Sequence, residues 1–283
     1  MLVDSMSPEL ACRLASVVQP GRRAGRGDPL PPLWQWAYFA AAVTNEQIGE
    51  DGHPKRDDPW AESFPRRVAG AGRVERLAPL VLGRPATKRS ALERAEEKSG
   101  RSGRLVVCDW RHTYLQDEVT VIDEVQTLVY RPRVPAQDWP SRAQQASPVI
   151  SPPPGHREDE GPSNGGRGSW SVVRRLEFNP TLLFRFSAST WNSHRIHYDR
   201  DYASSEGYPG LLVHGPLLAM LMAQEAEQAI GDLRLLEFRA LSPVFDNEVV
   251  DLYLDLTEIG CRLEARKPDG TLASFLTASA RAP

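Results

Sequence analysis

The 283 residues predict an α+β fold in which two antiparallel sheets are each wrapped around a central helix. Three observations lead to this fold class. Residues 217–230 form an apolar helical stretch, four strand-like segments follow it, and a segment rich in Pro, Gly and Ser separates these elements from an earlier set of strands. A helix that is apolar over two turns must be covered on most sides, and a curled sheet covers it.

The C-terminal part begins with a strand at 170–178 and contains the clearest helix. Residues 217–223 are all apolar, and acidic and amide side chains follow on the later turns. Pro216 suits the first helical position, and Gly231 suits the residue just past the end. The strands expected after the helix are 233–242, 247–257, 260–267 and 271–281, the last two joined by a Lys-Pro-Asp-Gly turn.

The N-terminal part has similar components in a less clear order. Residues 8–18 suit a short helix, and the run Leu33–Val43 is apolar almost all round, which predicts a buried helix. Alternation and β-branched residues predict strands at 66–78, 86–99, 103–114 and 118–131.

A compositional break divides the chain at 135–169. These 35 residues contain seven prolines, five glycines and five serines. Such a segment buries too little apolar surface to offset the entropy lost on ordering. We therefore expect an N-terminal domain at 1–134, a flexible linker at 135–169 and a C-terminal domain at 170–283.

Composition excludes several classes of function. The net charge of −3 gives no electrostatic basis for binding nucleic acid or an anionic membrane, and no apolar run is long enough to span a bilayer. Three widely spaced cysteines, Cys12, Cys108 and Cys261, predict buried thiols rather than disulfides or a zinc site. The expected location is the cytoplasm. Four arginines within the first 30 residues keep a mitochondrial presequence as the alternative.

Two segments of the C-terminal part resemble a known signature. Residues 187–198 read Ser-Ala-Ser-Thr-Trp-Asn-Ser-His-Arg-Ile-His-Tyr, and residues 208–218 read Tyr-Pro-Gly-Leu-Leu-Val-His-Gly-Pro-Leu-Leu. Together they resemble the hydratase motif of the MaoC-like enoyl-CoA hydratases and dehydratases. The resemblance implies a double hot dog fold. It also places the family's catalytic His at His197 and its His-Gly pair at His214 and Gly215.

This sequence departs from the usual motif in two places. Asn192 stands where the family has a catalytic Asp, and the pair His194-Arg195 replaces Asn-Pro. This form resembles the subgroup of mesaconyl-CoA and itaconyl-CoA hydratases and mitochondrial 3-hydroxyacyl-thioester dehydratases. N-terminal runs such as Asp51-Gly-His-Pro54 are similar to that subgroup as well. The similarity covers most of the chain outside 1–29 and 136–169.

The resemblance implies that His197 handles the proton of the attacking or leaving water. Asn192 can orient that water but cannot take up its proton. Two arrangements stay open. His197 acts alone or with His194 while Asn192 positions the water, or Asp199 supplies the missing carboxylate.

Four more residues are candidates for the site. The resemblance implies that the backbone N–H of Gly215 polarises the thioester carbonyl as an oxyanion hole. Arg195, Tyr198 and His214 are candidates for binding substrate, although each also suits an ordinary loop or packing role. The N-terminal part has no counterpart of the 192–197 run, so we expect it to be a degenerate hot dog that shapes the pocket at the contact between the two parts.

The expected activity is reversible hydration of a 2-enoyl thioester, with a short, branched or dicarboxylic acyl group. The thioester is carried by CoA or by an acyl-carrier protein, and the resemblance allows a homodimer. The alternatives are a thioesterase, which the same fold supports, and a non-catalytic or recruited thioester-binding protein. Nothing in the sequence requires a metal or another cofactor.

Overall fold

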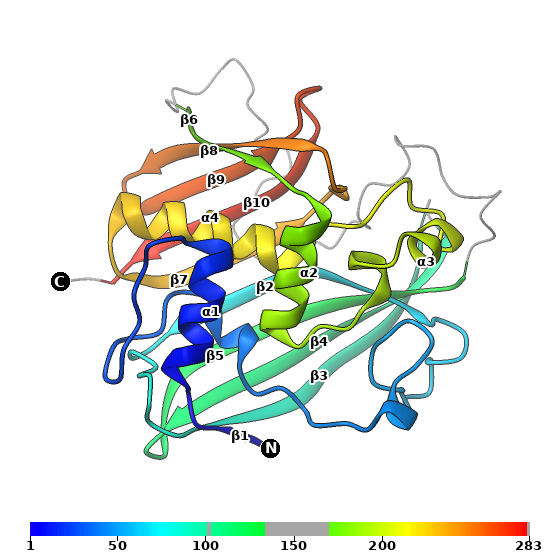
Figure 1. Ribbon diagram of the computed structural model, residues 1–283, viewed down its shortest axis with the longest axis horizontal. Coiled ribbons are helices and arrows are strands. Elements are labelled where there is room, and N and C mark those ends of the chain that lie inside the picture. Colours follow the sequence, from blue (N-terminus) through cyan, green and yellow to red (C-terminus); the bar gives the residue numbers. More distant parts are fainter. Residues whose placement is uncertain (101–102, 134–169, 282–283) are drawn as a thin grey trace.

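A computed structural model of the protein describes residues 1–100, 103–133 and 170–281. Its strands form one antiparallel ten-stranded sheet, in the order β1-β3-β4-β5-β2-β7-β10-β9-β8-β6. The sheet curves around the helices at 8–18, 180–190 and 215–230, which lie together inside the curve (Figure 1). This is the α+β arrangement that the sequence predicts. The predicted linker at 135–169 lies outside the described residues.

The two parts of the chain contribute five strands each to the sheet. The N-terminal strands are β1 (Leu2–Asp4), β2 (Arg66–Arg76), β3 (Ala86–Gly100), β4 (Gly103–Gln116) and β5 (Val119–Arg131). The C-terminal strands are β6 (Ser171–Glu177), β7 (Leu233–Ala240), β8 (Val249–Thr257), β9 (Gly260–Arg266) and β10 (Leu272–Ala280). Strands β2 and β7 pair where the two sets meet, with Ala71 opposite Arg239 and Glu75 opposite Leu235. The sheets expected for the two parts are therefore continuous.

Four α-helices occupy the described residues: α1 (Pro8–Val18), α2 (Pro180–Thr190), α3 (Arg200–Ser205) and α4 (Gly215–Ile230). Helix α4 packs on β7, β8, β9 and β10, and its residues from Leu217 to Ala223 are all buried. Gly231 ends it with a positive φ of 83° and donates its N–H to Glu227. The central helix of the C-terminal part and its end at Gly231 are thus confirmed, whereas the helix begins one residue before Pro216, at Gly215.

The helix predicted at Leu33–Val43 is wrong. Only the short 3₁₀ turn η1 (Trp34–Ala37) forms there, and backbone with positive φ stands on both sides of it, at Leu33 and Phe39. Side chains are buried up to Phe39, whereas residues 40–42 are exposed. An apolar run shows that a segment is buried but not that it is helical. Here the burial comes from packing against the sheet, because the Phe39 ring contacts Tyr114 of β4.

A buried carboxylate holds this segment in place. Glu124 on β5 is 1% exposed and accepts hydrogen bonds from Gln35 Nε2 (3.3 Å), Trp36 Nε1 (2.8 Å) and the Tyr114 hydroxyl (2.9 Å). A buried carboxylate is tolerated when several donors surround it. Polar contacts therefore fix the non-helical segment on the N-terminal part of the sheet.

Two expectations from composition can be checked in the described residues. Cys108 and Cys261 are buried as expected, but the expectation is wrong for Cys12, which is exposed on α1 with its thiol donating to the carbonyl of Ala24. The other face of that short helix is the one that packs. Among the described residues, none of the helices has the length and apolar character needed to cross a lipid bilayer.

Candidate active site

The motif residues lie on an irregular loop between α2 and α3. Helix α2 ends at Trp191, whose left-handed backbone (φ 53°, ψ 34°) turns the chain away from the helix axis. The Asn192 side chain then accepts a hydrogen bond from the backbone N–H of His194 (3.1 Å). A 3₁₀ turn, η5 (Arg195–His197), follows. Asn192 therefore closes a local turn that brings His194 and His197 to the same site.

His197 is held in one tautomer. Its Nδ1 lies 2.7 Å from the carbonyl oxygen of Leu212. Because a carbonyl can only accept, Nδ1 carries the proton and Nε2 is left as a base. The side chain is 7% exposed, and burial lowers its pKa to about 4 while the hydrogen bond to Leu212 opposes that shift. His197 is neutral at pH 7, as a general base must be.

The His214 ring stacks on the His197 ring. The two rings stack with centroids 3.6 Å apart and planes 21° from parallel. His214 is fully buried, and its Nε2 shares a hydrogen bond with Ser187 Oγ (2.8 Å). Burial keeps the pKa of His214 far below its usual value. The charges that His197 and His194 would carry lower it further. It lines the cavity and packs against the His197 ring.

A second pair of polar side chains comes from the N-terminal part of the chain. The His53 ring lies 4.2 Å from the His194 ring, and His194 lies 5.4 Å from His197. Asp51 Oδ2 is 3.2 Å from His53 Nδ1, and Asp51 Oδ1 accepts the His53 backbone N–H. Burial lowers the pKa of His53, and the hydrogen bond that His53 donates to Asp51 opposes this. Asp51 is thus the carboxylate nearest this row of imidazoles.

The loop that carries Asp51 is docked directly on the motif. The backbone N–H of Arg195 donates to the carbonyl of Asp51 (2.9 Å), and Ser193 Oγ donates to the carbonyl of Gly52. Gly52 has a φ of 89°, and a Cβ placed there would overlap the Ser193 carbonyl oxygen. Only glycine permits this backbone conformation and this close approach.

The N-terminus of α4 points its free N–H groups at the same place. Gly215 begins the helix, and Leu218 is the first residue whose N–H reaches back to His214 (3.2 Å). An added Cβ at Gly215 would meet no atom within 4 Å, so the space in front of it is open. The unpaired N–H groups and the helix dipole favour negative charge here.

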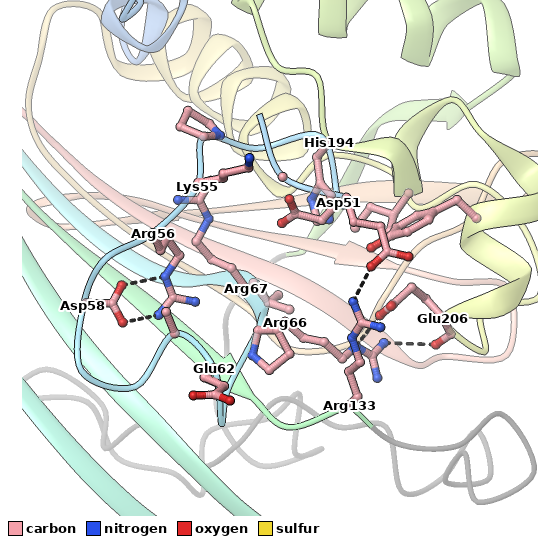
Figure 2. A pocket seen from close by; sticks show the side chains of 18 of the residues that line it. Asp51, Lys55, Arg56, Asp58, Glu62, Arg66, Arg67, Arg133, His194 and Glu206 are labelled. Atoms are coloured by element: carbon pink, nitrogen blue, oxygen red, sulfur yellow. Dashed lines mark hydrogen bonds and ion pairs between the residues drawn. The ribbon is translucent and has the colours of Figure 1, made fainter. Parts of the chain in front are cut away.

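These groups line one cavity of about 630 Å³. His53, His194, His197 and Gly215 all belong to its wall, and so do residues of β2, β5, β7 and β10. The cavity therefore lies where the N- and C-terminal parts meet, as expected. A second cavity of about 570 Å³ adjoins it and shares seven lining residues, among them His194 and Arg67 (Figure 2).

Three of the candidate residues, Asp199, Arg195 and Tyr198, lie outside the cavity wall. Both carboxylate oxygens of Asp199 are engaged: one caps α3 at Tyr202 N, and the other binds Arg195. Arg195 also donates to the carbonyl of Glu50 (3.2 Å), so it fastens the loop to the motif. Tyr198 is 42% exposed, with its hydroxyl bound to the Ser193 carbonyl. All three are absent from the wall of the 630 Å³ cavity.

Sequence reasoning missed Asp51, His53 and Arg67 as members of the site. The Asp-Gly-His-Pro run was a visible signal, but it gave no partner for either side chain because the contact with His194 spans about 140 positions. Arg67 follows another arginine at the start of β2, and nothing in the local pattern distinguishes the two.

The chain is similar to proteins of known family. The model of the family described as hydroxyacyl-thioester dehydratase type 2 matches residues 33–246. A mesaconyl-C(4)-CoA hydratase of Chloroflexus aurantiacus is 36% identical over 97% of this chain and 92% of its own length. The mitochondrial hydroxyacyl-thioester dehydratase type 2 of Schizosaccharomyces pombe is 26% identical over 81% of this chain and 78% of its own.

Solved structures agree on the fold. HtdX of Mycobacterium tuberculosis superposes with a TM-score of 0.69 at 16% identity, over 99% of this chain and all of the other. Another M. tuberculosis protein, described as having a double hotdog fold, gives a TM-score of 0.59 at 14% identity over 98% and 93% of the two chains. The double hot dog expected from the motif is therefore confirmed.

Proposed function

The chain belongs to the hydroxyacyl-thioester dehydratase type 2 family and is a hydro-lyase of enoyl and 3-hydroxyacyl thioesters; on this premise we propose the roles of its residues. One observation carries the proposal. The buried His197 ring, fixed by its hydrogen bond to Leu212, lies in a cavity that also holds the free N-terminus of α4. A base and an oxyanion donor therefore line the same cavity.

His197 and Gly215 divide the chemistry of hydration. His197 Nε2 takes a proton from water while the water oxygen attacks the β-carbon. The π electrons of the double bond move toward the thioester carbonyl, whose oxygen becomes negative and accepts the Gly215 N–H. The imidazolium then returns the proton to the α-carbon. Dehydration is the reverse of these steps.

Asn192 and the Asp51–His53 pair orient the water. Asn192 Oδ1 is bound to the His194 N–H, so its amide nitrogen is the group free to hold a water or hydroxyl oxygen. The hydrogen bond that His53 Nδ1 donates to Asp51 keeps the proton of His53 on Nδ1 and leaves its Nε2 as an acceptor. His194, whose pKa is lowered by burial and by the charges of its neighbours, is the neutral group between the two.

The carrier is CoA in this proposal, as in the name of the Chloroflexus relative. The homodimer, the domain division at 134 and 170 and the cytoplasmic location stay predictions. Thiol release in the assay below would instead favour the thioesterase.

The test compares the protein with its His197→Ala variant on crotonyl-CoA, mesaconyl-CoA and itaconyl-CoA. We expect the enoyl absorbance to fall without release of free thiol. The variant should lose about 10²–10⁴-fold in kcat, which is the usual contribution of a general base. Near-normal turnover in the variant would contradict the role of His197. Binding without any turnover in the unaltered protein would favour the non-catalytic alternative.

A further inference from the structure

The wall of the 630 Å³ cavity has an unusual charge composition. Among the described residues, five arginines line it and no aspartate or glutamate does; the arginines are Arg66, Arg67, Arg104, Arg131 and Arg133. Three of the five form ion pairs with glutamates that do not line the cavity: Arg66 with Glu206, Arg104 with Glu97 and Arg133 with Glu50. The remaining two, Arg67 and Arg131, have no ion pair within the described residues.

Arg67 is the one placed beside the imidazoles. Its positive charge lowers the pKa of both His53 and His194, after the larger effect of burial. In Figure 2 it lies in the middle of the adjoining cavity, with Asp51 and His194 above it and Arg66 beside it. On the neighbouring strand β5, the residue opposite Arg67 is neutral: it is Tyr130.

Arg67 is half-buried, and a charge partly removed from water is costly unless an opposite charge or several hydrogen bonds stabilise it. Burial accordingly lowers the pKa of Arg67. Asp51 is near, but its two oxygens already accept hydrogen bonds from the side chain and the backbone N–H of His53. The planar fork of an arginine matches a carboxylate with two parallel hydrogen bonds.

From this arrangement we infer that Arg67 binds a free carboxylate on the acyl group, so the substrate is a dicarboxylic enoyl or 3-hydroxyacyl thioester. The inference rests on the proposed function and adds the specificity determinant of the same site. The thioester carbonyl lies at Gly215, the reacting carbons lie near His197, and the second carboxylate lies at Arg67.

The same geometry argues against a cation between Asp51, His53 and His194. Their nearest donor atoms lie within 4.8 Å of one another, a spacing that three ligands of a metal ion would have. The charge of Arg67 acts on all three residues, however, and would repel a divalent ion there. We expect EDTA to leave the activity unchanged.

The test uses Arg67→Met and a matched control, Arg73→Met, on the same strand but at an exposed ion pair. Three substrates separate the sources of negative charge: mesaconyl-CoA, crotonyl-CoA, and the pantetheine thioester of mesaconate, which lacks the CoA phosphates. Arg67→Met should lower kcat/KM on both mesaconyl thioesters by about 100-fold more than it lowers kcat/KM on crotonyl-CoA. Arg73→Met should change none of them.

Other outcomes overturn the inference. A loss confined to the two CoA thioesters, absent with the pantetheine thioester, assigns Arg67 to a CoA phosphate. An equal loss on all three substrates together with a lower Tm assigns it a structural role. The inference instead predicts an unchanged or higher Tm, because the variant removes a half-buried charge that has no ion pair within the described residues.

Failure of the proposed function gives a different signature. In that case the unaltered protein hydrates none of the three thioesters. Calorimetric titration with the mesaconyl thioester of pantetheine then decides the inference by itself: binding that weakens about 100-fold in Arg67→Met supports it, and equal binding by both proteins overturns it.

Discussion

Asn192 works through two atoms with different partners. Its Oδ1 is committed to the backbone N–H of His194, which shapes the turn, while the amide nitrogen is free for the cavity. An aspartate could keep the same turn because a carboxylate oxygen accepts equally well. The substitution would therefore change the charge beside His197 without changing the path of the loop.

We expect Asn192→Asp to move the acidic limb of the kcat/KM profile upward by about one pH unit. The reason is that a nearby negative charge stabilises the His197 imidazolium, whose pKa in the unaltered protein is held at about 4 by burial. Activity needs the neutral ring and so falls as pH drops through that pKa. Asn192→Ala, measured in parallel, should leave the limb in place. If the two variants had the same limb, the carboxylate would not be sensed by His197.

Gly215 allows a second test at a single position. Its φ is not in the left-handed region, and an added Cβ would meet no protein atom. Gly215→Ala should therefore keep the Tm of the protein while lowering kcat/KM about 10- to 100-fold, because the methyl group occupies the space that the thioester oxygen must reach. A fall in Tm with unchanged kcat/KM would remove Gly215 from the oxyanion site.

Among the elements, the segment 33–39 shows where sequence reasoning succeeds and where it stops. Strands β4 and β5 were predictable because their apolar residues alternate, and helix α4 because its apolar run is bounded by Pro216 and Gly231. Segment 33–39 has no such period. Its shape depends on Glu124, about 90 positions away, and on the surface of β4. The contact between His53 and His194 escaped prediction for the same reason.

This segment leads to a prediction about stability. Glu124→Ala leaves three buried donors, on Gln35, Trp36 and Tyr114, without an acceptor. We expect the free energy of unfolding to fall by about 3 kcal/mol or more, since each buried donor left unsatisfied costs about 1–3 kcal/mol. Urea unfolding measures it, with Glu96→Ala as the control on an exposed ion pair of β3. Equal midpoints for the two variants would contradict the anchoring role of Glu124.

Across the whole molecule, the histidine cluster makes stability depend on pH. His194, His197 and His214 all have pKa values lowered by burial, so the folded protein keeps them neutral. The unfolded chain takes up protons on them below about pH 6.5. Above pH 6.5 these histidines are neutral in both states and do not reduce the free energy of unfolding. That free energy falls as the pH drops from 6.5 toward 4.

For His197 alone, the shift from about 6.5 to about 4 corresponds to about 3 kcal/mol at the acidic end. Urea midpoints of the protein and of His197→Gln at pH 7.5, 6 and 5 measure this. As the pH is lowered, we expect the urea midpoint of the unaltered protein to fall more than the midpoint of the variant. A difference that is independent of pH would show that His197 is not held neutral by the fold.

The continuous sheet has a consequence for stoichiometry. Two hot dog units related by the β2–β7 pairing could offer two equivalent sites, one at each central helix. Among the described residues, the cavity wall contains one helix N-terminus, that of α4, and the N-terminal part contributes His53 and strand residues to this wall instead. One chain should therefore bind one equivalent of a thioester inhibitor. Both units contribute to that single site: the C-terminal unit provides the base, and the N-terminal unit provides the binding wall.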